Sequence, residues 1–199
     1  MDKLNFNESL LVWINQDLSN PLFDVFFTWL SMKAGFSLPL ILLIILYIGK
    51  RYGKQGWIFG GLIIILTIFT DLIGNTLKDL FQHARPCLEM YDLIRAPFSE
   101  NTQCETSTSG MPSNHAMNFF SVFTFISFFF PYRKVIISSF GIAALVAISR
   151  VYLGDHFPSQ ILVGSAIGMA LGLGFAGLIH KWQPSLRFYE NKNPPTSSS

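Results

Sequence analysis

The chain has 199 residues, of which 50% are hydrophobic and only 13% are charged, and its net charge is +2. This charged share is about half of that in a soluble domain, which argues against an ordinary water-soluble globule, and the hydrophobicity excludes a disordered chain. The small net charge gives no reason to expect nucleic-acid binding, and two cysteines are too few for a disulfide scaffold. We therefore interpret residues 1–199 as one small integral membrane domain.

The two ends of the chain differ from its middle. Residues 1–34 mix polar and apolar side chains and are too polar to span a bilayer, so we expect a helical segment that lies in the membrane interface. Residues 186–199 end in Pro, Thr and Ser, which is typical of a disordered tail.

Between these ends the sequence contains a series of apolar segments. A helix needs about 20 residues to cross the hydrocarbon core, so we expect the first and shortest segment to borrow from residues 29–35. The pattern predicts an all-α, polytopic transmembrane helix bundle with five spans plus the N-terminal interfacial segment, and six spans are the alternative. The five segments are residues 36–49, 55–78, 115–132, 134–150 and 158–180.

Lysine and arginine predict the orientation of these spans, because cytoplasmic loops carry an excess of both. If the spans alternate, eight cations fall on one side, while the long loop 79–112 and the turn 151–157 fall on the other. We expect a multi-pass protein of a bacterial inner (plasma) membrane with its N-terminus outside. The eight cations are Lys50, Arg51, Lys54, Arg133, Lys134, Lys181, Arg187 and Lys192.

Both cysteines lie in the outer loop. Cys87 and Cys104 either form a disulfide in an oxidising compartment or remain two free thiols.

Cations and histidines gather at the outer ends of three different spans. Snorkelling at the boundary accounts for any one of them, but it accounts poorly for the whole group, because charges near a membrane are costly and normally pair or serve a function. A phosphate is the ligand that such a group suits. The group consists of Lys78, His83, Arg85, His115, Arg150 and His156.

The segment Gly110–His115 is typical of a helix start, with Pro112 and Ser113 in positions that suit a first turn and its cap. Free N–H groups at a helix start bind anions, although an ordinary helix start has the same pattern. Two histidines at separate span ends indicate chemistry: a neutral imidazole can attack phosphorus while a protonated one donates to the leaving oxygen. The sequence has no recognisable metal-ligand spacing, so we expect no metal site.

Three short motifs occur in this order and at these span ends: KDLFQHARP at 78–86, PSNH at 112–115 and SRVYLGDHFPSQ at 149–160. Together they resemble the signature of the type-2 phosphatidic acid phosphatase superfamily, which reads Lys-x6-Arg-Pro, Pro-Ser-Gly-His and Ser-Arg-x5-His-x3-Asp. Asn114 stands where the family has Gly, and Gln160 stands where it has Asp.

The resemblance implies hydrolysis of a lipid phosphate or diphosphate at the outer face of the membrane. His156 would be the nucleophile that forms a phosphohistidine, and His115 would protonate the leaving group and then activate water. Candidate substrates are undecaprenyl diphosphate, phosphatidylglycerol phosphate, phosphatidic acid and the 1-phosphate of lipid A. No metal or other cofactor is implied, and we expect a monomer. The residues expected to bind the phosphate are Lys78, Arg85, Ser113, Asn114 and Arg150.

The two departures leave questions open at this stage. Gln160 can accept a hydrogen bond from His156 through its amide oxygen but brings no charge, and Asp155 either compensates or faces solvent. Asn114 either caps the helix or contacts the substrate. Rival readings are a vanadate-type haloperoxidase, which shares the signature but is soluble, and a non-catalytic protein that binds or translocates a lipid phosphate.

Three further patterns have two interpretations each. One helix face carries three polar residues, Asp71, Asn75 and Lys78. Asp71 and Asn75 either support Lys78 as a polar column, or the polar residues of this face form hydrogen bonds to a neighbouring helix. Small residues at four-residue steps from Gly164 allow close packing, either within the monomer, as we expect, or in a dimer. His83 either contacts the headgroup or is an interfacial side chain.

Overall fold

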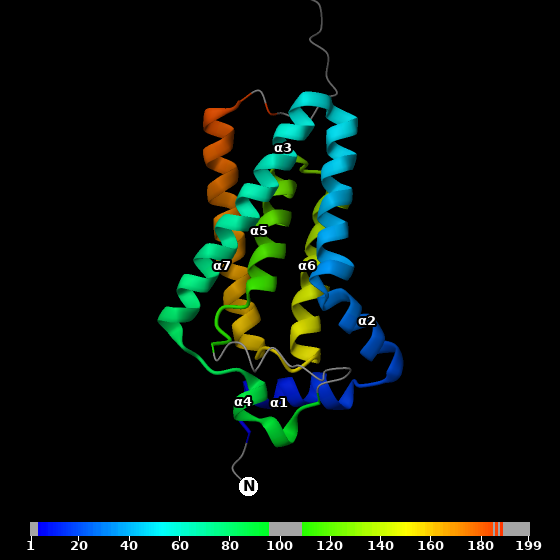
Figure 1. Cartoon of the computed structure of the whole chain (residues 1–199), viewed down its shortest axis with the longest axis vertical. Coiled ribbons are helices and arrows are strands. Elements are labelled where there is room, and N and C mark those ends of the chain that lie inside the picture. Colours follow the sequence, from blue (N-terminus) through cyan, green and yellow to red (C-terminus); the bar gives the residue numbers. More distant parts are fainter. Residues whose placement is uncertain (1–3, 96–108, 185, 187, 189–199) are drawn as a thin grey trace, which may run out of the picture.

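The computed structural model describes residues 4–95, 109–184, 186 and 188 (Figure 1). All regular secondary structure in these residues is helical, which confirms the expected all-α class. The elements in chain order are α1 (Phe6–Val12), η1 (Trp13–Asp17), α2 (Pro21–Ser31), η2 (Lys33–Ser37), α3 (Leu38–Phe81), α4 (Pro86–Glu89), η3 (Tyr91–Leu93), α5 (Asn114–Phe129), α6 (Arg133–Tyr152) and α7 (Pro158–Trp182).

Helix α3 consists of two arms that reverse direction at Gly53 (Figure 1). Gly53 has φ 59° and ψ −134°, a backbone conformation that glycine adopts at little cost. Gly56 lets the arms meet closely, because a Cβ at this position would lie 2.1 Å from the Ile48 carbonyl oxygen. The first two apolar segments of the sequence are therefore the arms of α3.

The expectation that the first apolar segment borrows from residues 29–35 holds for part of this range. Helix α2 ends at Ser31, and Met32 is extended, with φ −72° and ψ 121°. Helical structure resumes at Lys33, where η2 leads into α3, and the apolar stretch Lys33–Glu89 includes this turn.

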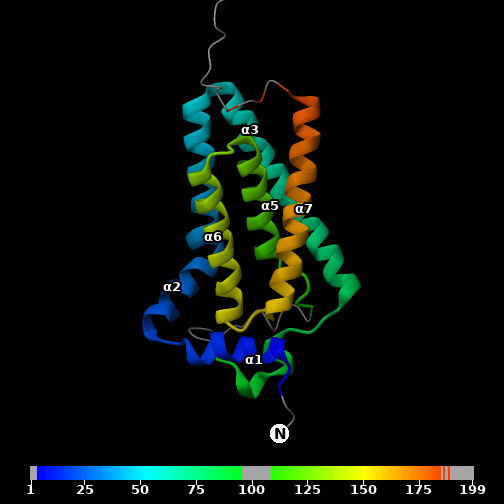
Figure 2. The ribbon, with the colours of Figure 1, turned by 180° about the vertical axis from the view of Figure 1, so that it is seen from behind.

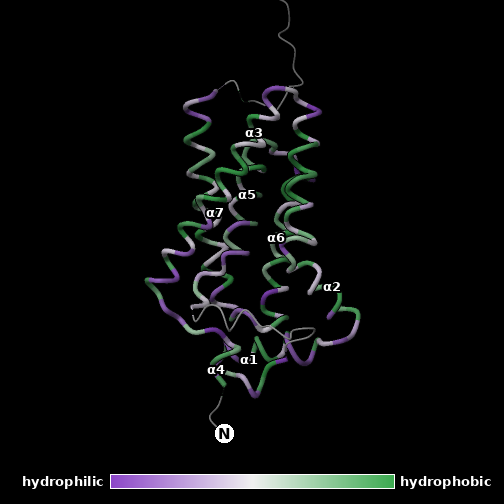
Figure 3. The backbone as a smooth tube through the Cα atoms, viewed as in Figure 1, coloured by the Kyte–Doolittle hydropathy of each residue, from purple (hydrophilic) through white to green (hydrophobic). Residues whose placement is uncertain are grey.

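In the described part of the chain, three helical stretches are long and apolar enough to cross a membrane: Lys33–Glu89, which includes both arms of α3, Arg133–Tyr152 and Pro158–Trp182. Helix α5 has only 16 residues and runs between the others. Hydrophobic residues follow the bundle helices and hydrophilic ones collect near their ends (Figure 3). The count of five spans stays a prediction.

Helix α5 packs most closely against α7, and glycines make this contact possible. A Cβ on Gly164 would lie 2.8 Å from the Ser113 carbonyl oxygen, and one on Gly168 would lie 2.4 Å from that of Met117. Gly172 repeats this approach one turn further along. The small residues of α7 therefore serve packing within one chain, as we expected.

The far end of the bundle contains an aromatic core that includes residues near the C-terminus. Leu186 and Phe188 are buried, and Phe188 stacks on Phe130 at 4.7 Å between ring centroids and meets Phe59 edge to face at 5.1 Å. The prediction of a disordered tail that begins at residue 186 is therefore wrong at its start, because these two side chains belong to the core. The residues after Phe188 lie outside the described part of the chain.

The segments that the charge pattern assigned to opposite sides of the membrane lie at opposite ends of the bundle. The Gly53 turn and the end of α7 lie at one end, and α1, α4 and the connection between α6 and α7 lie at the other (Figures 1 and 2). We call the second end the site end, because it contains residues 78–86, 109–115 and 153–157. All three sequence motifs reach it.

Helix α1 lies across the site end of the bundle (Figure 2). The Asn7 side chain exchanges two hydrogen bonds with Ser159 at the start of α7, at 3.0 and 3.1 Å. Leu11 is buried with Val151 and Phe157. The described part of the N-terminal segment is therefore helical, as predicted, and it covers the turn that carries His156.

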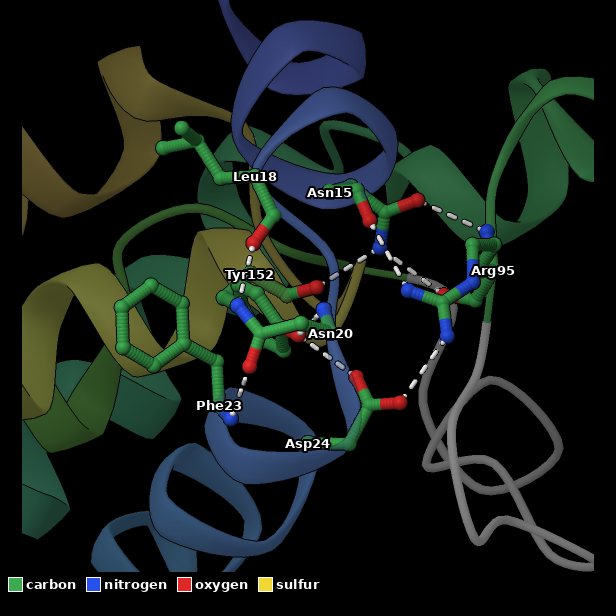
Figure 4. A network of polar contacts seen from close by, with 7 residues as sticks. All are labelled: Asn15, Leu18, Asn20, Phe23, Asp24, Arg95 and Tyr152. Atoms are coloured by element: carbon green, nitrogen blue, oxygen red, sulfur yellow. Dashed lines mark hydrogen bonds and ion pairs between the residues drawn. The ribbon is translucent and has the colours of Figure 1, made fainter.

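A buried polar network attaches this segment to the end of α6 (Figure 4). Asp24 accepts a hydrogen bond from the Tyr152 hydroxyl at 2.5 Å and forms an ion pair with Arg95 at 3.0 Å. Asn15 donates to the backbone carbonyls of Tyr152 and Arg95, at 2.6 and 2.9 Å. The network fixes the last turn of α6, where Arg150 lies.

The close approach of α5 and α7 predicts unequal effects of alanine at two glycines of α7. Gly168→Ala places a methyl group against the backbone of Met117, and we expect a loss of about 1–3 kcal/mol, the usual cost of overpacking. Gly174→Ala meets no atom within 4 Å and gains helix propensity, so it keeps or raises stability. Thermal unfolding in detergent measures both, and equal melting temperatures would contradict the packing account.

Candidate active site

The amide of Gln160, which is fully buried in the first turn of α7, lies at the centre of the site. Its Oε1 atom accepts a hydrogen bond from the backbone N–H of Phe157 at 3.1 Å and lies 3.1 Å from Nδ1 of His156. Its Nε2 atom donates to the carbonyl of Ala84 at 2.8 Å and lies 3.2 Å from Nδ1 of His83. One side chain thus joins residues of the first and third motifs.

These contacts determine the tautomer of His156. A backbone N–H can only donate and a carbonyl can only accept, so Phe157 and Ala84 together fix which end of the Gln160 amide is the oxygen. That oxygen faces Nδ1 of His156, which must therefore carry the hydrogen. The Nε2 atom of His156 keeps its lone pair, which is the form that a nucleophilic imidazole needs.

The surroundings of His156 favour its neutral form. His156 lies in the turn between α6 and α7, and only 2% of its surface is exposed. Burial lowers the pKa of His156 well below the usual 6.5, and the positive charges of Arg150 and Arg85 lower this pKa further. The imidazole is therefore uncharged at neutral pH, with a free lone pair on Nε2.

Arg150 is held in place from two sides. Its Nη2 atom forms an ion pair with Asp155 at 2.8 Å, and its Nη1 atom donates to the hydroxyl of Ser31 at the end of α2. The backbone carbonyl of Arg150 also accepts hydrogen bonds from the N–H groups of Asp155 and His156, at 3.0 and 3.2 Å. Asp155 therefore positions Arg150, which answers the question that its sequence position left open.

Arg85 and Ser113 present polar atoms that have no partner in the described part of the chain. Arg85 is 3% exposed, and its Nε and Nη1 atoms are buried without a hydrogen bond. Ser113 precedes α5, and its buried hydroxyl makes no capping bond, while its N–H donates to the Gln160 carbonyl at 3.3 Å. Lys78, in the last turn of α3, adds a charge that acts on Arg85 and Arg150.

His115 lies near the same cations. It lies in the first turn of α5, and the charges of Arg150 and Lys78, which act on His156, act on His115 too. Its Nε2 atom is buried without a hydrogen-bond partner among the described residues. This ring nitrogen can give or take a proton.

Asn114 does not cap α5, because Ser113 occupies the cap position. Its Nδ2 atom donates to Asn75 at 2.8 Å and to Asp71 at 3.4 Å, both on α3. Gly74 provides the space, since a Cβ there would lie 2.4 Å from Oδ1 of Asn114. The polar face of α3 therefore bonds a neighbouring helix, which was one of the two interpretations of its sequence.

Sequence reasoning missed several contributors to the site. His83 lies within the first motif at a position that the signature leaves open, and its contact with the Gln160 amide was not expected. Ser31 belongs to no motif and accepts a hydrogen bond from Arg150. Cys87 is disulfide-bonded, and Cys104 lies outside the described residues. Among the described residues, no group of three or more His, Cys, Asp or Glu side chains is placed to hold a metal ion.

The charge around His156 predicts how its titration responds to substitution. Arg85→Met removes one of the two arginine charges that lower the pKa of His156, so we expect this pKa to rise toward its usual value. Arg133→Met, at the exposed start of α6 on the opposite end of the bundle, serves as control. Histidine NMR titration in detergent measures both variants, and an unchanged pKa in Arg85→Met would contradict the described electrostatics.

Comparisons with known proteins agree with this geometry. The family model described as the PAP2 superfamily matches residues 55–184, which include all three motifs. A crystal structure titled the first transmembrane PAP2 type phosphatidylglycerolphosphate phosphatase from Bacillus subtilis superposes with a TM-score of 0.68 at 27% identity, covering 94% of this chain and 90% of that one.

Two curated relatives are named as phosphatases of lipids. Phosphatidylglycerophosphatase B of Bacillus subtilis is 32% identical over 69% of this chain and 65% of its own length. Lipid A 4'-phosphatase of Porphyromonas gingivalis is 26% identical over 85% of this chain and 71% of its own length. The resemblance seen in the three motifs is thus confirmed, and the chain belongs to the PAP2 superfamily, in which these relatives are membrane lipid phosphatases.

Proposed function

We propose that the chain hydrolyses a lipid phosphate or diphosphate at the site end of the bundle through a phosphohistidine on His156. The observation that carries the proposal is a set of buried polar atoms near this neutral imidazole that have no partner among the described residues: Nε and Nη1 of Arg85, Oγ of Ser113 and Nε2 of His115. Buried polar groups are normally hydrogen-bonded, so such a set calls for a ligand. A phosphate, with several acceptor oxygens, suits the guanidinium and the hydroxyl at once.

The first step of the proposed reaction is attack on phosphorus. The lone pair of His156 Nε2 forms a bond to phosphorus, the bond from phosphorus to the leaving oxygen breaks, and protonated His115 donates a hydrogen to that oxygen from Nε2. Arg85, Arg150 and Lys78 stabilise the charge on the phosphoryl oxygens. This is phosphoryl transfer through positioning and electrostatics.

The second step regenerates the imidazole. Nε2 of His115, now neutral, takes a proton from water while the water oxygen attacks the phosphohistidine. The bond from phosphorus to nitrogen breaks and inorganic phosphate leaves. Gln160 accepts from Nδ1 of His156 throughout, so the ring keeps one orientation and one tautomer through both steps.

Charge and topology support a place for this reaction at the outer face of a bacterial inner membrane. The turn between the arms of α3, whose sequence includes Lys50 and Arg51, lies at the opposite end of the bundle from the connection between α6 and α7 (Figure 1). Cationic turns of this kind face the cytoplasm. We propose undecaprenyl diphosphate, phosphatidylglycerol phosphate, phosphatidic acid and lipid A 1-phosphate as candidate substrates. The names of the relatives support phosphatidylglycerol phosphate and lipid A.

Metal-independent hydrolysis by His156 is tested with purified protein in detergent. We expect release of inorganic phosphate from at least one of the four lipids in the presence of EDTA, and loss of about 10⁴-fold or more in His156→Ala, because the nucleophile itself is removed. His180→Ala, at the other end of α7, is the matched control and keeps full activity. Binding of the lipids without any turnover would support the non-catalytic alternative instead.

The role of Gln160 is tested by removing its amide. Gln160→Leu leaves His156 Nδ1 without an acceptor, so we expect kcat to fall by about 10²–10⁴-fold, the range attributed to a correctly placed acid or base. KM should change much less, because Arg85, Arg150 and Lys78 still bind the phosphate. The exposed Gln55→Leu is the control. A normal kcat in Gln160→Leu would show that the tautomer of His156 is fixed by other contacts.

A further inference from the structure

A cleft between α3 and α5 opens beside His115, and apart from Asn114 and His115 its lining residues belong to none of the three motifs. Its volume is about 190 Å³, far more than one water molecule needs. One part of its wall is apolar and includes Leu38, Ile41 and Phe119. The other part is polar and includes Lys33, at the start of η2, and Asp71.

The side chain of Lys33 makes no ion pair or hydrogen bond with any other residue that the structure describes. Asp71, the acid in the cleft wall, instead accepts hydrogen bonds from the amides of Asn118, at 2.8 Å, and Asn114, at 3.4 Å. Lys33 is exposed and lines the cleft, so its ammonium group is available to an anion.

Lys33 acts on one side of the reaction centre only. Its charge acts on His115 and on Lys78, whereas the cations that act on His156 are Arg150, Arg85 and Lys78. The reacting phosphate must lie next to His156, and the leaving group must lie next to His115. Lys33 is therefore placed beside the leaving group.

We propose that the α3–α5 cleft is a second binding subsite, in which Lys33 binds an anionic phosphorus group carried by the leaving group of the substrate. The inference rests on the proposed function and narrows its substrate class. Substrates that fit have two phosphorus groups, either a phosphodiester joined to the terminal phosphate by a short linker or the two halves of a diphosphate. The apolar part of the cleft wall contacts the lipid atoms that follow the second phosphorus group.

The acceptors inside the cleft support this placement. Oδ1 of Asn114 and Oδ1 of Asn118 are buried without a partner among the described residues, and the Asp71 carboxylate lies beside them. These oxygens disfavour an anion deep in the cleft and favour a hydroxyl, so the anionic group must lie at Lys33. A hydroxylated linker between two phosphorus groups satisfies both parts of the wall.

The test compares three lipids in detergent with EDTA: phosphatidylglycerol phosphate and undecaprenyl diphosphate, whose leaving groups keep an anionic phosphorus group, and phosphatidic acid, whose leaving group is neutral. We expect Lys33→Met to raise the KM for the first two lipids roughly tenfold, because one hydrogen bond to a charged group contributes on this scale. The KM for phosphatidic acid should stay unchanged. Lys33→Arg keeps the positive charge, so its KM for the first two lipids should stay close to that of the wild-type protein. Lys134→Met, an exposed lysine at the start of α6, is the matched control.

The possible outcomes separate the two proposals. An equal change in KM for all three lipids, or no change for any, overturns the role of Lys33 and leaves the proposed function intact. A larger effect on phosphatidylglycerol phosphate than on the diphosphate supports the hydroxylated linker as well. A wild-type protein that hydrolyses none of the three lipids overturns the proposed function, and this inference with it.

Discussion

The amide of Gln160 is the interaction on which the rest of the site depends. A carboxylate here would accept from His156 and Phe157 but would place its second oxygen against the Ala84 carbonyl, which also accepts only. An amide offers one acceptor and one donor, and the backbone on each side requires that combination. The residue that departs from the family signature is therefore matched to its own surroundings, and it orients the imidazole of His156 without a charge.

Close helix packing brings the second motif to this amide. The glycines of α7 let the α5 backbone approach until the N–H of Ser113 reaches the carbonyl of Gln160. The same contact sets the position of His115, two residues into α5. Packing and catalysis are thus linked directly, because a larger side chain at Gly164 would move Ser113 away from the phosphate site.

The sequence predicted that the cations, the helix start and the two imidazoles of the three motifs lie together at one end of the bundle, and the structure places them there. Their roles in phosphoryl transfer stay a proposal. The sequence could not predict the supporting contacts. His83 lies 77 positions from Gln160, and Ser31 lies 119 positions from Arg150. Such pairs carry no spacing rule, since only tertiary packing brings them together. The buried Leu186 and Phe188 were missed for a related reason: two apolar residues next to a polar, proline-rich ending show no periodic pattern.

The two buried arginines show where the structure satisfies its own charge and where it leaves charge for a ligand. Arg150 has Asp155 and Ser31 as partners, which offset much of the cost of burying a guanidinium. Nε and Nη1 of Arg85 have no partner among the described residues, although Arg85 is buried too. The folded state bears the desolvation cost of those atoms, and an anion bound there would offset this cost. Arg150 is therefore a fixed wall of the site, while Arg85 is the arginine that would gain more from the phosphate of the proposed reaction.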